Sequence, residues 1–153
     1  MPSPEAAPVP EAPHDPQAPH DPESQVILPE RIRDYLAAPR FAVVATIKPD
    51  GWPHQAFVWY LLTDEGIVIN SRRERQWPRN LIADPRISIA VQDFDEPEEW
   101  VGVTGRAEVL HEGDAATEDI MAMARRYGSN PDKYRGQDRV SFLVRPERTF
   151  EYR

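Results

Sequence analysis

The sequence predicts a mainly β domain in which roughly six antiparallel strands form a barrel with a few peripheral helices. Three observations lead to this class. Short segments rich in β-branched and aromatic residues recur between turn sequences such as KPDG at 48–51 and TDEG at 63–66. Helical periodicity is confined to short segments, so the regular strand–helix alternation of a parallel sheet is missing. Gly102 and Gly105 lie inside a long strand segment, as expected at a bulge or a barrel bend.

The strands follow from residue types and alternation. Apolar or alternating segments predict strands at 41–47, 55–62, 67–70, 86–91, 100–110 and 140–152. Pro146 interrupts the last segment, because proline cannot donate a ladder hydrogen bond. We therefore expect this part of the chain to lie at a sheet edge or at a bulge.

Three short helices are expected, at 29–38, 76–83 and 114–127. Pro29 suits the first position of a helix. Pro78 belongs in the first turn of the second helix, because it has no backbone N–H to donate. Asp114 is suited to cap the third helix, and Gly128 to end it.

Residues 1–24 form a separate segment rich in Pro, Ala and Glu, in which APHDP occurs twice. This segment has too few apolar residues to form a core. We therefore expect a disordered tail followed by one domain over 25–153. His14 and His20 repeat in this tail. Metal binding by these histidines has little support beside the simpler interpretation of a solubilising extension, and we assign no metal site.

Composition excludes several classes of protein. The net charge is -8, and the tail accounts for five of its negative charges, so the body is nearly neutral and lacks the broadly basic composition of a nucleic-acid-binding protein. There is no cysteine, which excludes disulfides and thiolate metal sites. With no membrane-length apolar run and no signal peptide, a cytoplasmic protein without membrane attachment is expected.

The segment NSRRERQWPRNL, residues 70–81, concentrates positive charge where a strand passes into a helix. It brings Asn70, Ser71, Arg72 and Arg75 toward a helix N-terminus, where free amides and the helix dipole attract anions. Guanidinium groups add bidentate donors for a phosphate, and Trp77 offers a flat apolar surface beside them. The segment therefore predicts a site for a ring system that carries a phosphate.

A purely structural interpretation stays open at this point. The arginines can form a solvated connection with surface ion pairs to Glu65, Glu74 or Asp84. Arg73 and Arg79 suit such a role, and Asn80 can brace a loop. The side chains of Trp59 and Trp100 also suit the core.

The order of these elements resembles the split-barrel flavin-binding family of the pyridoxamine 5′-phosphate oxidases, and within it the branch that uses the deazaflavin coenzyme F420. The resemblance spans 26–153. It is carried by FAVVATIKPDGWPHQAFVWYLL (41–62), INSRRERQWPRNLIADPRISIAV (69–91), WVGVTGRAEVL (100–110), MARRYG (123–128) and VRPERTFEY (144–152).

The resemblance implies an FMN-binding-like split barrel, a homodimer and two cofactors at the subunit interface. It implies that Arg75, Asn80 and the backbone of Asn70 and Ser71 hold the phosphate, with Arg79 as a weaker candidate. Many relatives carry a lysine at the position of Trp77, and here Arg72 or Arg73 is expected to replace that charge. The remaining expected contacts are Val58, Trp59, Tyr60 and Ile69 at the ring, and Gln92 and Trp100 at the cofactor of the partner subunit.

The resemblance further implies an oxidoreductase in which reduced coenzyme F420 transfers a hydride to a planar conjugated small molecule. Two alternatives are an FMN-dependent oxidoreductase of the pyridoxamine-phosphate-oxidase type and a non-catalytic flavin- or deazaflavin-binding module. His54, Tyr60 and Tyr127 are possible proton donors that also suit structural roles, so the catalytic residues stay unassigned.

Overall fold

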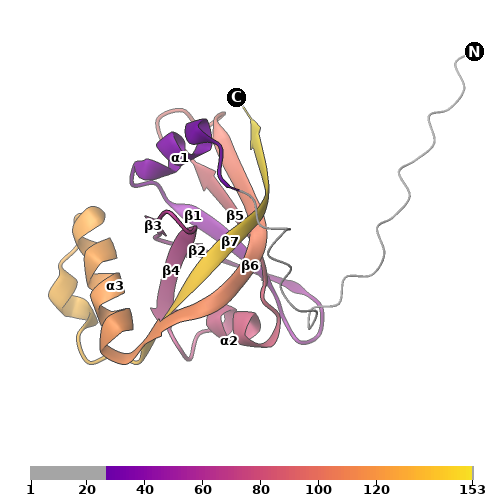
Figure 1. The fold of residues 1–153 in the computed structure, drawn as a ribbon. Coiled ribbons are helices and arrows are strands. Elements are labelled where there is room, and N and C mark those ends of the chain that lie inside the picture. The colour runs from indigo at the N-terminus through magenta and orange to yellow at the C-terminus, as the bar shows by residue number, and fades with distance from the viewer. Residues whose placement is uncertain (1–26, 153) are drawn as a thin grey trace, which may run out of the picture.

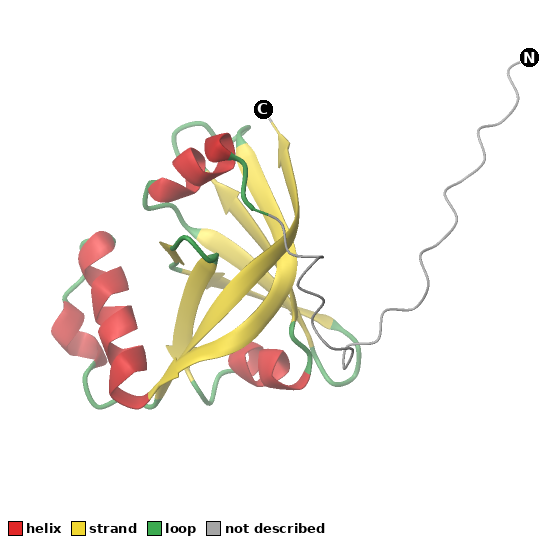
Figure 2. Ribbon diagram, in the orientation of Figure 1, coloured by secondary structure: helices red, strands yellow, loops and turns green. Residues whose placement is uncertain are grey.

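The computed structural model describes residues 27–152, in which seven antiparallel strands form one sheet and helices lie around it (Figure 1). The strands are β1 (Ala42–Ile47), β2 (Pro53–Val58), β3 (Leu61–Leu62), β4 (Ile67–Arg72), β5 (Arg86–Gln92), β6 (Trp100–Glu112) and β7 (Arg139–Tyr152). The helices are α1 (Glu30–Ala37), α2 (Gln76–Ala83), α3 (Gly113–Arg126) and the 3-10 helix η2 (Pro131–Tyr134). The predicted mainly β class with peripheral helices is confirmed (Figure 2). The expected tail over 1–24, with its two histidines, lies outside the described residues.

The sheet order is β2-β1-β5-β6-β7-β4-β3, so the two edge strands, β2 and β3, are consecutive in the chain. Two residues, Trp59 and Tyr60, join them. This short connection requires the sheet to curl until its edges approach each other. Within 27–152 no ladder pairs β2 with β3, so the barrel is split, as predicted, and not closed.

The strand count differs from the expected six because the segment expected as one strand at 55–62 divides at Trp59. β2 ends at Val58 and pairs with β1, whereas Leu61 and Leu62 pair with β4 at the other edge. Tyr60 is buried at the division and donates its hydroxyl to the Ala38 carbonyl at 3.0 Å. Phe57 and Val58 before the break and Leu61 and Leu62 after it are all apolar, so the residue types next to the break give no sign of it.

A bulge bends the ladder between β6 and β7, with a register shift between Thr104 and Gly105. Gly105 lies opposite Pro146, and a β-carbon at Gly105 would lie 2.1 Å from the Arg145 carbonyl oxygen. The predicted bulge is therefore confirmed, and close backbone approach requires glycine there. β7 runs through Pro146 without a break, but beyond Val144 it pairs with β6 alone, and the register shift lies opposite Pro146, so the expected edge or bulge position is confirmed. The register shift accommodates a residue that cannot donate to the ladder.

The helices occupy separate positions around the sheet (Figure 1). α2 packs at one end against β1, β2 and β6, α1 lies at the opposite end near β3, and α3 packs along β4, β6 and β7. The main core fills the interior of the curled sheet and includes residues of α1 and α2. A second cluster packs α3 on the sheet and contains Val68, Ile120, Met123 and Leu143.

The helix ends agree with most of the sequence signals. α2 begins at Gln76, as the position of Pro78 predicts, and Gly128 follows α3 with a left-handed φ of 73°. The predicted cap of α3 is wrong by two residues, because Glu112 and not Asp114 precedes its first helical residue. Gly113, with φ of 57°, makes the turn from β6 into the helix.

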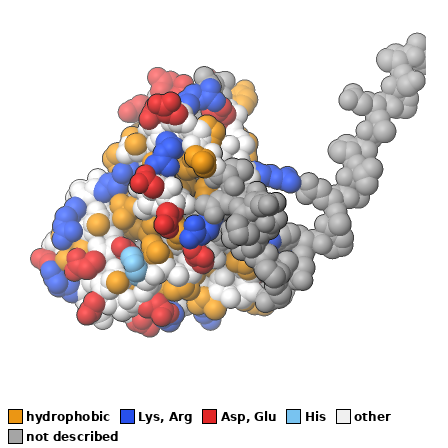
Figure 3. All heavy atoms as spheres, viewed as in Figure 1, with side chains coloured by type: hydrophobic (Ala, Val, Ile, Leu, Met, Phe, Trp, Pro, Cys, Tyr) orange, Lys and Arg blue, Asp and Glu red, His pale blue; other side chains and the backbone are white. Residues whose placement is uncertain are grey.

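The described surface carries mixed charge. On the face shown in Figure 3, acidic and basic side chains are interspersed, with hydrophobic side chains between them. Across residues 27–152, none of the helices is long and apolar enough to cross a bilayer.

Candidate functional site

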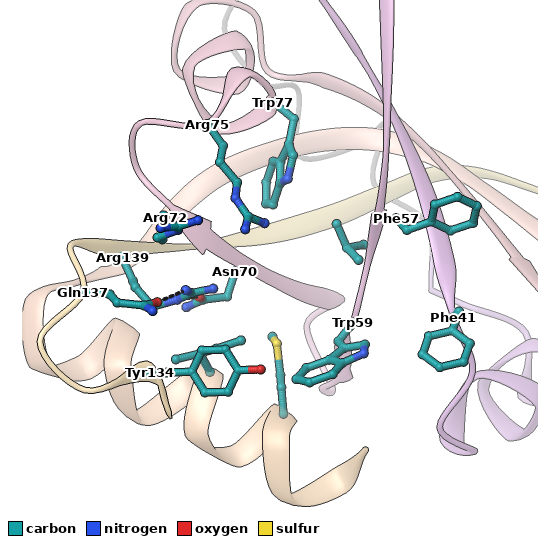
Figure 4. A pocket seen from close by; sticks show the side chains of 13 residues that line it. Phe41, Phe57, Trp59, Asn70, Arg72, Arg75, Trp77, Tyr134, Gln137 and Arg139 are labelled. Atoms are coloured by element: carbon teal, nitrogen blue, oxygen red, sulfur yellow. Dashed lines mark hydrogen bonds between the residues drawn. The ribbon is translucent and has the colours of Figure 1, made fainter. Parts of the chain in front are cut away.

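A cavity of ≈ 460 Å³ opens beside the junction of β4 and α2 (Figure 4). Residues from β2, β4, α2, α3, η2 and the start of β7 meet there, although they are far apart in the sequence. The described lining contains three arginines and no acidic residue, which makes the cavity positively charged. The lining residues are Phe41, Phe57, Val58, Trp59, Asn70, Arg72, Arg75, Trp77, Ile120, Met123, Tyr134, Gln137 and Arg139.

Arg139, the first residue of β7, holds a buried positive charge in this cavity. Its residue exposure is 5%, and within 27–152 no carboxylate lies within ion-pair distance of it. Its Nε donates to Asn70 Oδ1 at 2.7 Å, and its Nη1 donates to Gln137 Oε1 at 2.5 Å. Burial lowers the pKa of Arg139 to about 10, and the charges of Arg75 and Arg72 contribute to this lowering. The guanidinium still carries its charge at neutral pH, so the site stabilises an anion.

Arg72 and Arg75 bring two further cations to the cavity. Asn70 and Arg72 are two positions apart on β4 and therefore face the same side of the sheet. Arg75 directly precedes α2, and Figure 4 shows its guanidinium extending from α2 into the cavity. Arg72 has a 3.6 Å contact with Glu74, whereas the Arg75 guanidinium has no hydrogen bond or ion pair with another described residue. Arg75 is therefore available to a ligand.

Aromatic side chains form the less polar part of the cavity. Trp59 stacks on Tyr127, with ring centroids 5.1 Å apart and an interplanar angle of 6°. Tyr134 meets Trp59 edge-on, and the Arg139 guanidinium carbon lies 5.3 Å from the Tyr134 ring centroid. Trp77 packs on Phe142 and is nearly fully buried, so it serves the core and the cavity wall at once. These rings offer flat apolar surface beside the positive charge.

Four of the predicted site residues on β4 and α2 do not line this cavity. Ile69 and Ser71 alternate with Asn70 and Arg72 on β4, so both are buried on the opposite face. Asn80 is buried and connects α2 to β1 through a 3.0 Å hydrogen bond to Thr46 Oγ1. The fourth, Arg79, is exposed and donates to Gln76 Oε1 at 2.9 Å.

The structural interpretation applies to Arg73 as well. Its guanidinium pairs with Glu112 at 2.8 Å and with Asp138 at 3.5 Å, outside the cavity. The Glu112 carboxylate raises the pKa of Arg73. The arginine cluster therefore divides into cavity residues and surface pairs, and no single interpretation holds for all of it.

Gln92 and Trp100 lie opposite each other on β5 and β6 and line a second cavity, of ≈ 450 Å³. This cavity is mostly apolar, and Phe41 and Phe57 border both cavities. The Gln92 side chain donates to the Pro97 carbonyl at 2.6 Å. The fold therefore brings Gln92 and Trp100 together, but in a different cavity from Arg72, Arg75 and Arg139.

Arg139, Gln137 and Tyr134 were not expected from the sequence. All three come from the segment that leads from η2 into β7, about sixty residues beyond the arginine segment in the chain. The sequence held one sign of Arg139. β7 begins with mostly apolar residues, but Arg139 and Ser141, two positions apart on the same face, are polar. An arginine at such a position needs either a carboxylate partner or a ligand.

The tyrosines divide into two kinds. Tyr60 and Tyr127 donate their hydroxyls to the carbonyls of Ala38 and Arg40, at 3.0 and 2.5 Å, which supports their structural interpretation. Tyr134 is the phenol that lines the cavity, and its hydroxyl makes no hydrogen bond with another described residue. Figure 4 shows this hydroxyl directed into the cavity, toward Trp59.

Together the described residues suit a ligand with an anionic group and a flat apolar ring. The three guanidinium groups would hold the anion, because a desolvated cation binds an anion more strongly than an exposed one does. Trp59, Val58 and Met123 would contact the ring.

No curated protein sequence gave a match to the chain.

Solved structures that resemble this fold are numerous. One described as an F420 reductase is 29% identical with a TM-score of 0.68, covering 80% of this chain and 98% of its own. A conserved hypothetical protein from Mycobacterium tuberculosis is 26% identical with a TM-score of 0.69, covering 88% of this chain and 89% of its own. The heme storage protein HutZ from Vibrio cholerae is 20% identical with a TM-score of 0.66, covering 83% of this chain and 96% of its own, and shares the fold alone.

The family comparison covers nearly the whole described domain. The sequence profile described as pyridoxamine 5′-phosphate oxidase matches residues 28–153. This range includes every strand of the split barrel and every residue that lines the two cavities. The chain therefore belongs to the pyridoxamine 5′-phosphate oxidase family.

Proposed function

We propose that this protein is an oxidoreductase that binds the deazaflavin coenzyme F420 and uses its reduced form to reduce a planar conjugated small molecule. The buried charge of Arg139 carries the proposal, because this cation is desolvated in a cavity whose described lining holds no carboxylate. The similarity to an F420 reductase supports this cofactor over others in the family.

The residues present suit such a cofactor. Arg75 and Arg139 would hold its phosphate through charge-assisted hydrogen bonds, and Arg72 would add a third positive charge. Asn70 and Gln137 already orient the Arg139 guanidinium from two sides, at 2.7 and 2.5 Å. This pre-organisation reduces the entropy that binding would otherwise cost.

A bound reduced deazaflavin supplies a hydride, and the protein positions the ring and manages the proton. Val58, Met123 and the face of Trp59 that is not stacked on Tyr127 would contact the ring and exclude water. Tyr134 is the proton donor in this proposal, because its hydroxyl lies in the cavity without a described hydrogen-bond partner. The proton would pass from its Oη to the reduced substrate.

A second copy of the chain would complete the site. Phe57 and Phe94 are 82% and 90% exposed, and both border the apolar second cavity. Large exposed aromatic residues around one hollow are typical of a surface that another molecule covers. A homodimer that buries this surface would bring Gln92 and Trp100 of one protomer toward the cofactor of the other.

FMN is the alternative cofactor, because its ring and phosphate would fit the same set of residues. A parallel titration of the full-length protein with coenzyme F420, FMN and hemin, followed by quenching of Trp59 and Trp77 fluorescence, separates these possibilities. The hemin arm is included because HutZ is a heme storage protein. The proposal expects F420 to bind at least about tenfold more tightly than FMN or hemin, equivalent to about 1.4 kcal/mol.

A turnover assay completes this test. Reduced F420 should be consumed with some member of a panel of enones, quinones and tetrapyrroles. Tight FMN binding and a yellow preparation would replace F420 by FMN in the proposal. Tight F420 binding without turnover across the panel would support a non-catalytic carrier, and binding of none of the three ligands would overturn the cofactor site itself.

A further inference from the structure

A continuous chain of hydrogen bonds leads from Arg139 in the cavity to the surface of α3. Arg139 Nε lies 2.7 Å from Asn70 Oδ1, and Asn70 Nδ2 lies 2.8 Å from Ser141 Oγ. Ser141 Oγ lies 2.6 Å from Asp119 Oδ2, which in turn lies 2.7 Å from His111 Nδ1. Neither Ser141 nor Asp119 lines the cavity.

The register of the sheet explains why these residues meet. Ser141 on β7 is paired with Asn70 on β4 at one side and with His111 on β6 at the other. Arg139 is two positions before Ser141 and shares its face. α3 covers this face and places Asp119 above Ser141. Three neighbouring strands and one helix therefore contribute one residue or two each to the chain of hydrogen bonds.

The direction of every hydrogen bond in this chain follows from one fact, since a guanidinium group can only donate. Asn70 must therefore turn its Oδ1 toward Arg139, which leaves its Nδ2 to donate to Ser141 and to the Ala116 carbonyl, each at 2.8 Å. Ser141 accepts from Asn70, so its one hydroxyl proton points to Asp119. The carboxylate of Asp119 accepts this proton, and it also accepts from His111 Nδ1, because a carboxylate has no proton to donate.

We propose that Asp119 is a positioning residue for the anion site, because it holds Arg139 in its binding orientation through Ser141 and Asn70. The proposal rests on the anion site of the proposed function, but it concerns residues outside the cavity. Aligned hydrogen bonds strengthen one another, so an ionised end group tightens the bond at the opposite end. Asp119 thereby acts as a remote counter-ion and leaves Nη2 of Arg139 for the ligand, since Nη1 already donates to Gln137.

A simple field effect predicts the opposite sign. If Asp119 acted on the site merely as a nearby negative charge, its removal would strengthen anion binding. If it acts through the hydrogen bonds, its removal weakens binding, because Arg139 loses its fixed orientation. Asp119→Asn keeps the size of the side chain and removes its charge, and Ser141→Ala removes one hydrogen-bonding group. Glu118→Gln is the matched control, since Glu118 is an exposed neighbour on α3 outside the hydrogen-bonded series.

The experiment uses full-length protein and two readouts. The first is hydrogen exchange of the arginine Nε–H groups in proton–nitrogen NMR spectra, in which Arg139→Lys identifies the Arg139 signal by deleting it. The second is the dissociation constant for inorganic phosphate. Asp119→Asn and Ser141→Ala should both speed exchange at Arg139 Nε–H and weaken phosphate binding by about threefold to tenfold, the range that one net hydrogen bond allows. Glu118→Gln should change neither quantity.

Unchanged Arg139 exchange in Asp119→Asn, or phosphate binding as tight as in the parent protein, would overturn the proposal. Asp119→Asn decides the question even if Ser141→Ala does not fold, because Asp119 is only partly buried. A parent protein that binds neither phosphate nor F420 nor FMN would refute the proposed function separately. In that event exchange at Arg139 alone would still decide the positioning role, with faster exchange supporting it and unchanged exchange refuting it.

Discussion

Arg139 lies directly opposite Arg72 in the ladder between β4 and β7, and both side chains line the same cavity. Like charges at directly opposite positions destabilise an antiparallel pair. Burial adds to this effect at Arg139, as the lowered pKa of its guanidinium indicates. A sheet with such a pair is less stable than it would be without it, and a bound anion can restore this lost stability.

We therefore expect phosphate to stabilise the fold. At a phosphate concentration about one hundred times its dissociation constant, the gain is about 2.7 kcal/mol, which corresponds to a rise of several degrees in melting temperature. In Arg139→Gln this rise should disappear, because the buried cation is gone. Arg73→Gln is the control, since Arg73 pairs with Glu112 and Asp138 outside the cavity. Differential scanning calorimetry measures both, and an equal rise in the two variants would contradict the anion site.

The second expectation concerns Arg75. Arg75→Ala should weaken binding of coenzyme F420 by about 1.5–3 kcal/mol, the value for a hydrogen bond to a charged group. Fluorescence titration of the two variants Arg75→Ala and Arg79→Ala compares two arginines at the start of α2. Arg79 points outward and contacts Gln76, so its removal should leave affinity nearly unchanged. Equal losses in the two variants would mean that only overall charge matters.

Tyr134→Phe separates proton donation from binding. It should lower kcat by about a hundredfold or more, the usual contribution of a general acid, while the dissociation constant for F420 stays the same. The assay is the rate at which reduced F420 is consumed. Tyr127→Phe removes a hydroxyl that donates to the Arg40 carbonyl, so it should lower stability and leave turnover intact. A fully active Tyr134→Phe would assign the proton to solvent.

The alkaline behaviour of the fold should depend on Tyr60. Burial raises the pKa of Tyr60 to about 12. The unfolded chain therefore loses this proton near pH 10 while the native protein keeps it, so stability is lost as pH rises from about 10 to about 12. The slope is at most about 1.4 kcal/mol per pH unit.

Tyr60→Phe removes this titration. The variant should be about 1 kcal/mol less stable near neutral pH, because it lacks the hydrogen bond to the Ala38 carbonyl. Its stability should then decline less steeply than that of the parent protein above pH 10. Urea unfolding across this range gives both slopes, and parallel slopes would show that Tyr60 ionises equally in the two states.

Gly105→Ala tests the bulge between β6 and β7. The added carbon would lie 2.1 Å from the Arg145 carbonyl oxygen, which is backbone and cannot rotate away. We expect a loss of about 1–3 kcal/mol or more in the free energy of unfolding, as for other overpacked sites. The urea midpoint measures this loss. An unchanged midpoint would mean that the two strands separate at Gly105 without cost.

The sequence was sufficient for those features that depend on neighbouring residues. Pro78 located the start of α2, Gly128 marked the end of α3, and Gly105 indicated the bulge. These features are local, because strand period and turn chemistry act over a few residues. They were enough to predict the fold class and one wall of the cavity.

Features that depend on distant contacts were not predictable in this way. The division of the segment 55–62 at Trp59 follows from pairing with two different strands, and the residue types on either side are alike. Arg139 reaches Arg72 only because β7 pairs with β4 in the folded sheet. Ser71 was expected at the site and is buried on the other face, since the same alternation that selects Asn70 excludes its neighbour.

The edges β2 and β3 meet at a seam where no ladder pairs them, and the chain crosses this seam through Trp59 and Tyr60. A ring that rests on Trp59 would lie across this seam and join both margins of the sheet. A bound ligand would then hold β2 and β3 together and slow the motions by which these two strands move apart. Amide protons in these two outer strands would be the place to observe it, since they would exchange more slowly once the ring is in place.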